Sequence, residues 1–165
     1  MTSQSQSHAG QHALSAVPSL VRESPTGPET PVQVMGPARI LAVDDNPINL
    51  EVLREQLRIL GHAVDCAECG ADALVKWTAS DYRLLLVDCQ MPVMDGRELA
   101  LRIRQQEHQS NKHAPIRIIG WTGNATEENA SACMAAGMDD LLTKPVTLRM
   151  LAEKLVRWLP PATSR

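Results

Sequence analysis

Five side chains suited to phosphoryl chemistry each stand at or just beyond the end of a short, strand-like run of mostly apolar residues. They are the acids Asp44, Asp45 and Asp88, the hydroxyl of Thr122 and the ammonium of Lys144. The runs cover residues 40–43, 84–87, 116–119 and 141–142. Such runs predict buried strands, and open parallel sheets place their chemistry at the carboxyl ends of the strands. We therefore expect these groups to share one crevice, which would suit a phosphoryl group and a divalent cation.

Each of these residues also has a plain structural explanation. The segment 44–47 could cap a helix, Thr122 could begin an ordinary helix entry, and Lys144 could be a solvated charge before a turn. Asp95 and Gly96 are typical of a turn rather than of catalysis. The convergence at one sheet edge favours a site, because unpaired acids there would repel one another unless a cation or basic group lay between them.

Helical periodicity alternates with these runs from residue 39 onward. A first helix begins at the start signals Asn46 and Pro47 and ends at Gly61, with apolar residues repeating at helical spacing, namely Ile48, Val52, Leu53, Leu57 and Leu60. Further helices are predicted at 72–79, 96–106, 127–136 and 148–159, further strands at 62–66, 83–88 and 116–121, and a polar loop at 107–114. The alternation predicts an α/β fold, a flavodoxin-like doubly wound five-stranded parallel sheet of strand order 2-1-3-4-5 with five helices.

Composition separates terminal tails from a folded domain and limits the class of protein. Residues 1–37 are rich in Ser, Gln, Pro, Thr and Gly and lack periodicity, which predicts a disordered tail or linker before a folded domain at 38–160 and a short tail at 161–165. A net charge of −3, with no Phe and one Tyr, argues against direct nucleic-acid binding. No apolar stretch approaches the ~20 residues that span a bilayer, and no signal peptide is evident, so we expect a cytoplasmic location.

The four cysteines suggest no separate chemistry. Cys66 and Cys69 form a single C-x-x-C pair, whereas a zinc site needs further ligands at suitable spacing. We expect this pair, together with Cys89 and Cys133, to be small buried apolar residues in a reducing compartment.

The motifs around these strand ends resemble those of response-regulator receiver domains of two-component phosphorelays. The matching segments are 43–47, 88–96 with its Met-Pro and Met-Asp-Gly, 122–125, 136–140 and Lys144-Pro145. They span residues 38 to 159 in the family's order. The residues within these motifs most resemble those of receivers carried by hybrid sensor histidine kinases. The folded domain at 38–160 would then be the receiver.

The resemblance implies roles for the site residues. Asp88 would accept a phosphoryl group from a phosphohistidine on a partner. Mg²⁺ would be the cofactor, bound by Asp45, Asp88 and the backbone carbonyl of Gln90, with Asp44 acting through water. Lys144 and Thr122 would each pair with a phosphoryl oxygen.

The resemblance also implies positions that regulate the phosphorylated state. Gln90 and Asn124 would tune hydrolysis. Leu141 stands where the family usually has an aromatic switch residue three positions before the lysine, and together with the small-residue helix at 127–136 it would form the surface that switches. The partner would dock over the start of the first helix and the loop at the lysine, at Asn46, Pro47, Ile48 and Pro145. Ile48 could equally be a core residue.

The resemblance implies a phosphoacceptor that is not a turnover enzyme, stand-alone or part of a hybrid kinase tethered to the inner membrane. Its donor would be a histidine kinase or a histidine phosphotransfer protein. Two alternatives remain open. An aspartate-nucleophile phosphatase of the haloacid dehalogenase type would need an acid at position 90, where this chain has Gln90, and a receiver-like scaffold would normally have lost site acids or the lysine.

Overall fold

Strands and helices alternate along the whole described part of the chain, which comprises residues 39–110 and 114–159 of a computed structural model. The elements are β1 (Ile40–Val43), α1 (Pro47–Ile59), β2 (Val64–Ala67), α2 (Gly70–Ala79), β3 (Leu84–Asp88), α3 (Gly96–Ser110), β4 (Arg117–Thr122), α4 (Glu127–Ala135), β5 (Asp140–Thr143) and α5 (Leu148–Trp158). The predicted tails at 1–37 and 161–165 lie outside the described residues.

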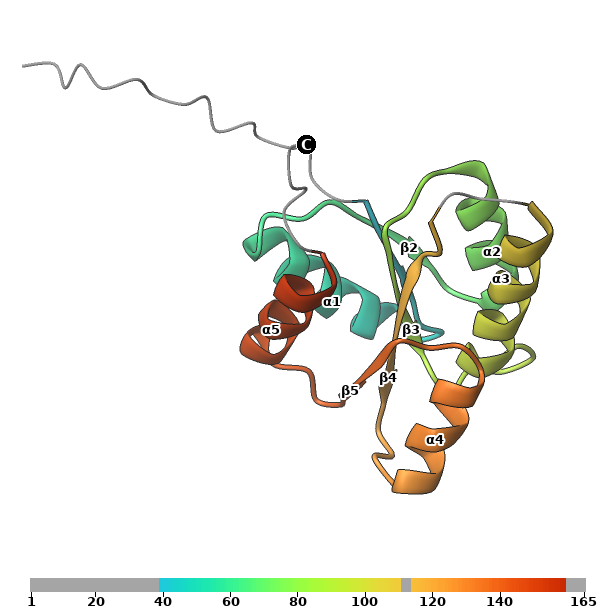
Figure 1. The fold of residues 1–165 in the computed structure, drawn as a ribbon. Helices are drawn as coiled ribbons and strands as arrows, with labels where there is room; N and C mark the ends of the chain where they lie inside the picture. The colour runs from blue at the N-terminus through green and yellow to red at the C-terminus, as the bar shows by residue number, and fades with distance from the viewer. Residues whose placement is uncertain (1–38, 111–113, 160–165) are drawn as a thin grey trace, which may run out of the picture. The chain divides into compact units, whose positions relative to one another are not determined.

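The five strands form one parallel sheet in the order β2-β1-β3-β4-β5, so the predicted fold class and topology are confirmed. Helices α1 and α5 cover one face, and α2, α3 and α4 lie on the other (Figure 1). Along β1, Leu41 and Val43 pack under α2 and α3, whereas Ile40 and Ala42 pack under α1 and α5. Because both of their faces are buried, β1 and the first four residues of β3 are continuous apolar runs rather than alternating patterns.

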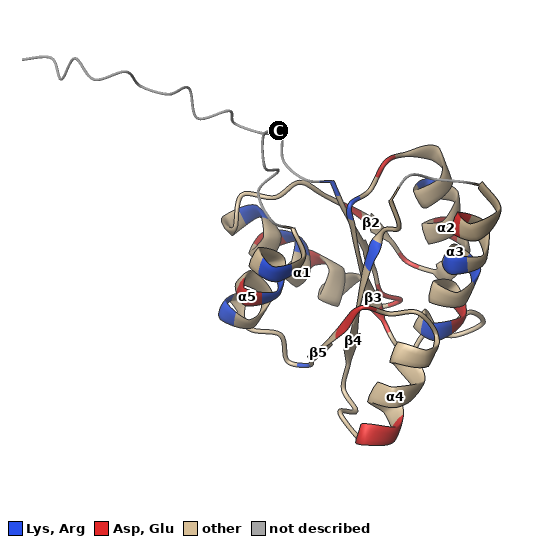
Figure 2. Cartoon of the chain, viewed as in Figure 1, with Lys and Arg blue, Asp and Glu red and all other residues tan. Residues whose placement is uncertain are grey.

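The helices begin at polar caps. Asn46 accepts a hydrogen bond from the N–H of Ile48 at the start of α1, and Asp95 accepts one from Glu98 at the start of α3. Asp95 is therefore a turn and capping residue, as its sequence suggested. In α4 the first turn is acidic (Figure 2), an arrangement that favours the positive end of the helix dipole.

The predicted apolar face of α1 is partly wrong. Leu50, Leu53 and Leu57 are buried, whereas Ile48 and Val52 are 71% and 53% exposed. The buried residues follow the three- and four-residue spacing of one helical stripe. Ile48 and Val52 are four residues apart and form a second, solvent-facing stripe.

Several element boundaries differ from the prediction by one residue, and three larger differences arise where polar contacts extend a helix or turn. β2 begins at Val64, since Gly61 has a φ of 81° and the N–H of His62 still bonds to Leu57 in the turn that ends α1. α2 begins at Gly70 rather than at 72 because Cys69 caps it. α3 continues to Ser110, so residues 107–110 are helical where a loop was predicted, and residues 111–113 of that loop lie outside the described residues.

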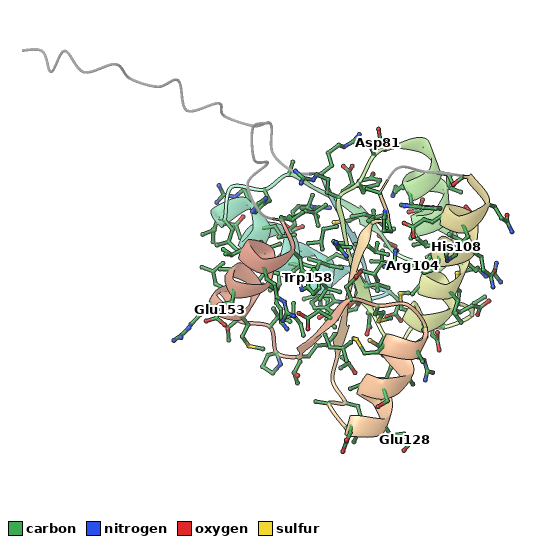
Figure 3. All side chains as sticks on the ribbon, viewed as in Figure 1. Asp81, Arg104, His108, Glu128, Glu153 and Trp158 are labelled. Carbon is green, nitrogen blue, oxygen red and sulfur yellow. The ribbon has the colours of Figure 1, made fainter. Side chains whose placement is uncertain are left out.

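Arg104 explains the longer α3. It donates hydrogen bonds to the carbonyls of Gly137 and Ile116, each at 2.9 Å, and forms ion pairs with Glu107 and Asp139 at 2.7 and 2.8 Å. In Figure 3 its side chain lies between α3 and the strands beside it. This one guanidinium therefore ties α3 to β4 and to the turn before β5, where apolar periodicity gives no signal.

The cysteine prediction holds for two of the four residues. Cys89 and Cys133 are buried with their sulfurs 3.6 Å apart, and all four thiols are free. Cys66 is half-buried and Cys69 is exposed, so the prediction of burial is wrong for this pair. The sulfur of Cys69 accepts the N–H of Asp72 at 3.5 Å, which is a capping contact. Among the helices described, none has the length and apolar character needed to cross a bilayer.

Candidate functional site

The last residue of β3, Asp88, is the centre of the site. Its side chain is 8% exposed. One carboxylate oxygen accepts the backbone N–H of Gln90 at 3.1 Å, and the other lies 3.0 Å from the ammonium of Lys144. Burial raises the pKa of Asp88 above its ordinary value, against the opposing effects of the Gln90 N–H and the Lys144 ammonium.

Asp44 and Asp45 follow β1 and have opposite environments. Asp44 is fully buried, and its oxygens accept from the backbone N–H of Asn46 at 2.8 Å and from the side-chain amide of Asn49 at 3.1 Å. Asp45 is exposed and has no hydrogen bond or ion pair to any residue that the structure describes. Asp45 therefore has the freer carboxylate of the two.

Lys144 bridges the acids from the end of β5. Its ammonium lies 3.2 Å from Asp44 and 3.0 Å from Asp88. Burial works against its charged form, but hydrogen bonds and charge from Asp88 and Asp44 raise the pKa of Lys144 overall. The reading of Lys144 as a solvated charge before a turn is wrong.

The three acids fit a divalent cation. One oxygen each from Asp44, Asp45 and Asp88 lies within 4.8 Å of the others. An all-oxygen donor set with one exposed carboxylate suits Mg²⁺, which binds proteins through one or two carboxylates and keeps several waters. Since Asn46, Asn49 and Lys144 already occupy the oxygens of Asp44, direct ligation fits Asp45 and Asp88 better.

Thr122 reaches the same edge, but its hydroxyl bonds within its own loop. It accepts the N–H of Asn124 at 3.0 Å, donates to the Asn124 carbonyl at 3.1 Å, and accepts from the side-chain amide of Asn129 at 3.3 Å. The ladder places Asp88 opposite Trp121, so Thr122 stands one residue beyond the acid. Asp44, Asp45, Asp88 and Lys144 therefore converge as predicted, because they are in direct contact or a short distance apart. For Thr122, only its position in the strand register places it at the same edge of the sheet.

The other predicted positions lie around this centre. Leu141 is half-buried against Gly120, where a Cβ would come within 2.7 Å of its side chain. The positions predicted for hydrolysis and docking are all exposed, namely Gln90, Asn124, Asn46, Pro47, Ile48 and Pro145. Of the two interpretations of Ile48, the one that places it on the surface is confirmed, and the one that makes it a core residue is wrong.

Glycine is required at the turn that closes the site. The N–H of Gly96 donates to the carbonyl of Cys89 at 3.3 Å, and a Cβ on Gly96 would collide with the backbone carbonyl of Asp88. A larger residue would therefore displace the strand end that carries the central acid.

Sequence reasoning missed three residues that position the site. The side-chain amide of Asn49 donates hydrogen bonds to Asp44, and that of Asn129 donates one to Thr122. The indole ring of Trp121 lies under the ammonium of Lys144, with 4.6 Å between the ring centroid and Nζ. Asn49 and Asn129 are each the third residue of the helix that follows a site strand. That shared position was an available signal, although polar residues there usually suggest capping alone.

Comparison with known proteins gives consistent matches. Residues 40–156 match the family model described as response regulator receiver domain. Histidine kinase 5 of Arabidopsis thaliana is 35% identical over 79% of this chain, GacS of Pseudomonas protegens 37% over 83%, and BvgS of Bordetella pertussis 39% over 76%. The chain spans only 17%, 15% and 10% of these relatives, respectively.

Solved structures agree with this match. One is the complex of the Saccharomyces cerevisiae histidine phosphotransfer protein Ypd1 with the receiver domain of Ssk1 (TM-score 0.71, 31% identity, covering 76% of this chain and 91% of the matched chain). Another is the receiver domain of the sensor histidine kinase PA1611 from Pseudomonas aeruginosa, with a magnesium ion in its active-site cleft (TM-score 0.67, 35% identity, covering 76% and 99%).

Proposed function

Since this chain belongs to the family of response regulator receiver domains and is thus a module of two-component phosphorelays, we propose that it accepts a phosphoryl group on Asp88 in a Mg²⁺-dependent reaction. One observation carries the proposal. The Asp88 carboxylate is buried at a strand end, 3.0 Å from the Lys144 ammonium and within 4.8 Å of the oxygens of two further acids. A solvated surface carboxylate would have neither the fixed cation nor the clustered acids.

The transfer can be written with the residues of this site. The donor is a phosphohistidine on a partner protein or domain. Its P–N bond breaks, a P–O bond forms to the Asp88 carboxylate, and the donor imidazole keeps the electron pair of the broken bond. Such transfers depend on in-line placement and charge stabilisation more than on an acid or base. Lys144 stabilises one phosphoryl oxygen. The Thr122 hydroxyl donates a hydrogen bond to another once it has broken its hydrogen bonds to Asn124 and Asn129.

The metal assignment rests on the donor set. Asp45 and Asp88 would hold Mg²⁺ together with the backbone carbonyl of Gln90, and Asp44 would act through water. The cation would offset the charge of the phosphoryl oxygens. In support, the structurally similar PA1611 receiver contains magnesium in its active-site cleft.

Phosphorylation places a group with a charge of about −1.5 to −2 next to Thr122 and Lys144, in place of the Asp88 carboxylate. We propose that this pulls Thr122 out of its bonds to Asn124 and Asn129, so that the start of α4 and the surface at Leu141 shift. Two observations support α4 as the moving element. Cys133 is its only fully buried residue, and its third residue, Asn129, bonds to Thr122. Gln90 and Asn124, exposed beside the acid and the threonine, would tune hydrolysis of the acyl phosphate.

The partner would be a histidine kinase or a histidine phosphotransfer protein that docks over the start of α1. Asn46, Pro47, Ile48 and Pro145 are exposed and follow the ends of β1 and β5, and three of them are apolar. The similarity to a receiver crystallised with Ypd1 supports a partner of this kind. The domain would act in the cytoplasm, alone or as part of a hybrid kinase, without binding nucleic acid directly and without turnover of an external substrate.

Incubation with acetyl phosphate tests this proposal. We expect the intact mass to rise by one phosphoryl group in the presence of Mg²⁺ and not in the presence of EDTA. The adduct should resist acid and hydrolyse in base, as an acyl phosphate does. Absence of the adduct with Mg²⁺ present, or equal labelling in EDTA, would overturn the proposal.

A further inference from the structure

Trp121 occupies a core position with a polar group that the core does not satisfy. It is 6% exposed and packs in the apolar layer between the sheet and helices α1 and α5. Its indole N–H is buried without a hydrogen-bond partner among the described residues. A buried donor without a partner is unfavourable, and Leu or Phe would fill the layer without that cost. The indole therefore requires an explanation beyond packing.

The register of the sheet places this ring between the acid and the lysine. Trp121 pairs with Asp88 on one side and with Leu142 on the other. Side chains two residues apart along an extended chain share a face, so Lys144 follows Leu142 on the same face as Trp121. The N–H of Lys144 continues the ladder by donating to the carbonyl of Thr122 at 2.8 Å. The site acid, the ring and the lysine thus come from three adjacent strands.

The lysine ammonium is enclosed on three sides. The carboxylates of Asp44 and Asp88 lie 3.2 and 3.0 Å away, and the centroid of the Trp121 ring lies 4.6 Å away. This distance is within the range of a cation–π interaction, for which Trp is the best partner, and the interaction strengthens where water is partly excluded. The Lys144 side chain is only 26% exposed.

We propose that Trp121 is a positioning residue for Lys144 in phosphoryl transfer, an inference that rests on the proposed function. A lysine side chain has a flexible four-carbon stem and does not fix its ammonium by itself. The indole face holds one side of the ammonium without using any of its N–H donors. These donors stay directed to carboxylates in the resting state and can turn to a phosphoryl oxygen on Asp88, while the ring contact persists.

The test compares Trp121→Leu and Trp121→Phe with Ile119→Ala. Ile119 lies two residues earlier on the same strand and in the same apolar layer, is fully buried, and pairs in the sheet with Leu86 and Asp140 rather than with a site acid, so its variant controls for lost packing. Labelling by acetyl phosphate and Mg²⁺ should slow about fivefold or more in Trp121→Leu and less in Trp121→Phe, which keeps an aromatic face. In Ile119→Ala it should stay near the wild-type rate at a comparable loss of thermal stability.

Nuclear magnetic resonance provides a readout that does not depend on phosphorylation. The Hε protons of Lys144 should be shifted upfield by the ring in the wild-type protein, and this shift should disappear in Trp121→Leu. Equal slowing of labelling in Trp121→Leu and Ile119→Ala, or an unchanged Lys144 shift in Trp121→Leu, would overturn the proposal. If the wild-type protein took no label at all, the proposed function would fail, and the shift alone would then decide whether the indole holds the ammonium.

Discussion

The side-chain amide of Asn129 lies 3.3 Å from the hydroxyl of Thr122 and 2.8 Å from the carbonyl of Asn124. The first residues of α4 therefore hold the Thr122 hydroxyl in the loop that it would have to leave on phosphorylation. The resting state of the proposed switch is stabilised by this contact as well as by the backbone of Asn124.

Removing this contact should favour the phosphorylated state. We expect Asn129→Ala to bind beryllofluoride with Mg²⁺ about two- to fivefold more tightly, which corresponds to the loss of one modest hydrogen bond. Titration followed by intrinsic tryptophan fluorescence would measure this affinity. Glu128→Ala, at an exposed neighbouring position on the same helix, is the control and should leave the affinity unchanged. Weaker binding by Asn129→Ala would show that Asn129 supports the active state instead.

The lifetime of the acyl phosphate should depend on Gln90 and Asn124. Both are exposed two residues beyond Asp88 and Thr122, where a water molecule would approach the phosphoryl group. We expect Gln90→Arg and Asn124→Ala to change the decay rate several-fold with little change in the labelling rate. The measurement is the loss of label after removal of acetyl phosphate, and unaltered decay in both variants would exclude these residues from the path of the water.

Docking of the phosphohistidine partner should depend on Ile48. Its 71% exposed side chain lies at the start of α1 beside the site, and Val75, 66% exposed on α2, is a matched apolar residue on another helix. We expect Ile48→Asp to slow transfer from a phosphohistidine protein about tenfold, a loss of ~1.4 kcal/mol at the interface. Labelling by acetyl phosphate and thermal stability should remain nearly unchanged.

The control Val75→Asp should leave both reactions intact. Equal slowing of transfer and of acetyl phosphate labelling by Ile48→Asp would place the damage in the site. Equal slowing of transfer by both variants would point to a general effect of the added negative charge.

Asp140 gives a prediction about stability and pH. Burial would raise its pKa, but hydrogen bonds from Lys154 at 2.6 Å and Trp158 at 2.8 Å outweigh burial and lower the pKa of Asp140 below its ordinary value. The stability that it contributes is therefore present above the pKa of an unfolded aspartate and is lost as pH falls through the lowered folded-state value.

Asp140→Asn should thus lower the free energy of unfolding by about 1–3 kcal/mol at neutral pH. Denaturant titrations at a series of pH values would show the difference shrinking as the medium becomes acidic. A difference that stays constant with pH would mean that the charge of Asp140 contributes nothing. The site acids should be unaffected, since Asp140 lies at the start of β5 rather than at its end.

Much of the fold could be predicted from the sequence because β1 and β3 are buried along their whole length and β4 is buried after its first residue. Continuous apolar runs such as 84–87 could be recognised without knowing their neighbours, and the polar or charged residue at or after the end of each run marked the edge where the site lies. Asp44, Asp88 and Lys144 could therefore be brought together before their contacts were known.

The missed features depend on tertiary contacts between residues far apart in the sequence. Arg104 extends α3 through carbonyls and acids of distant segments, and the role of the Trp121 ring depends on which strand carries Lys144. Ile48 was ambiguous because its spacing fits the apolar pattern of α1, whereas Leu50 and Leu53 occupy the buried stripe. Patterns in the sequence predict which face of an element is apolar less reliably than they predict the element itself.

The central claim is that Asp88 receives the phosphoryl group. Borohydride reduction converts an aspartyl phosphate to homoserine, so peptide mass spectrometry after labelling with acetyl phosphate and Mg²⁺ identifies the modified residue. We predict conversion at Asp88 alone, none at Asp44 or Asp45, and no label in Asp88→Asn. Conversion at another acid of the wild-type protein, or undiminished labelling of Asp88→Asn at a single site, would contradict the account.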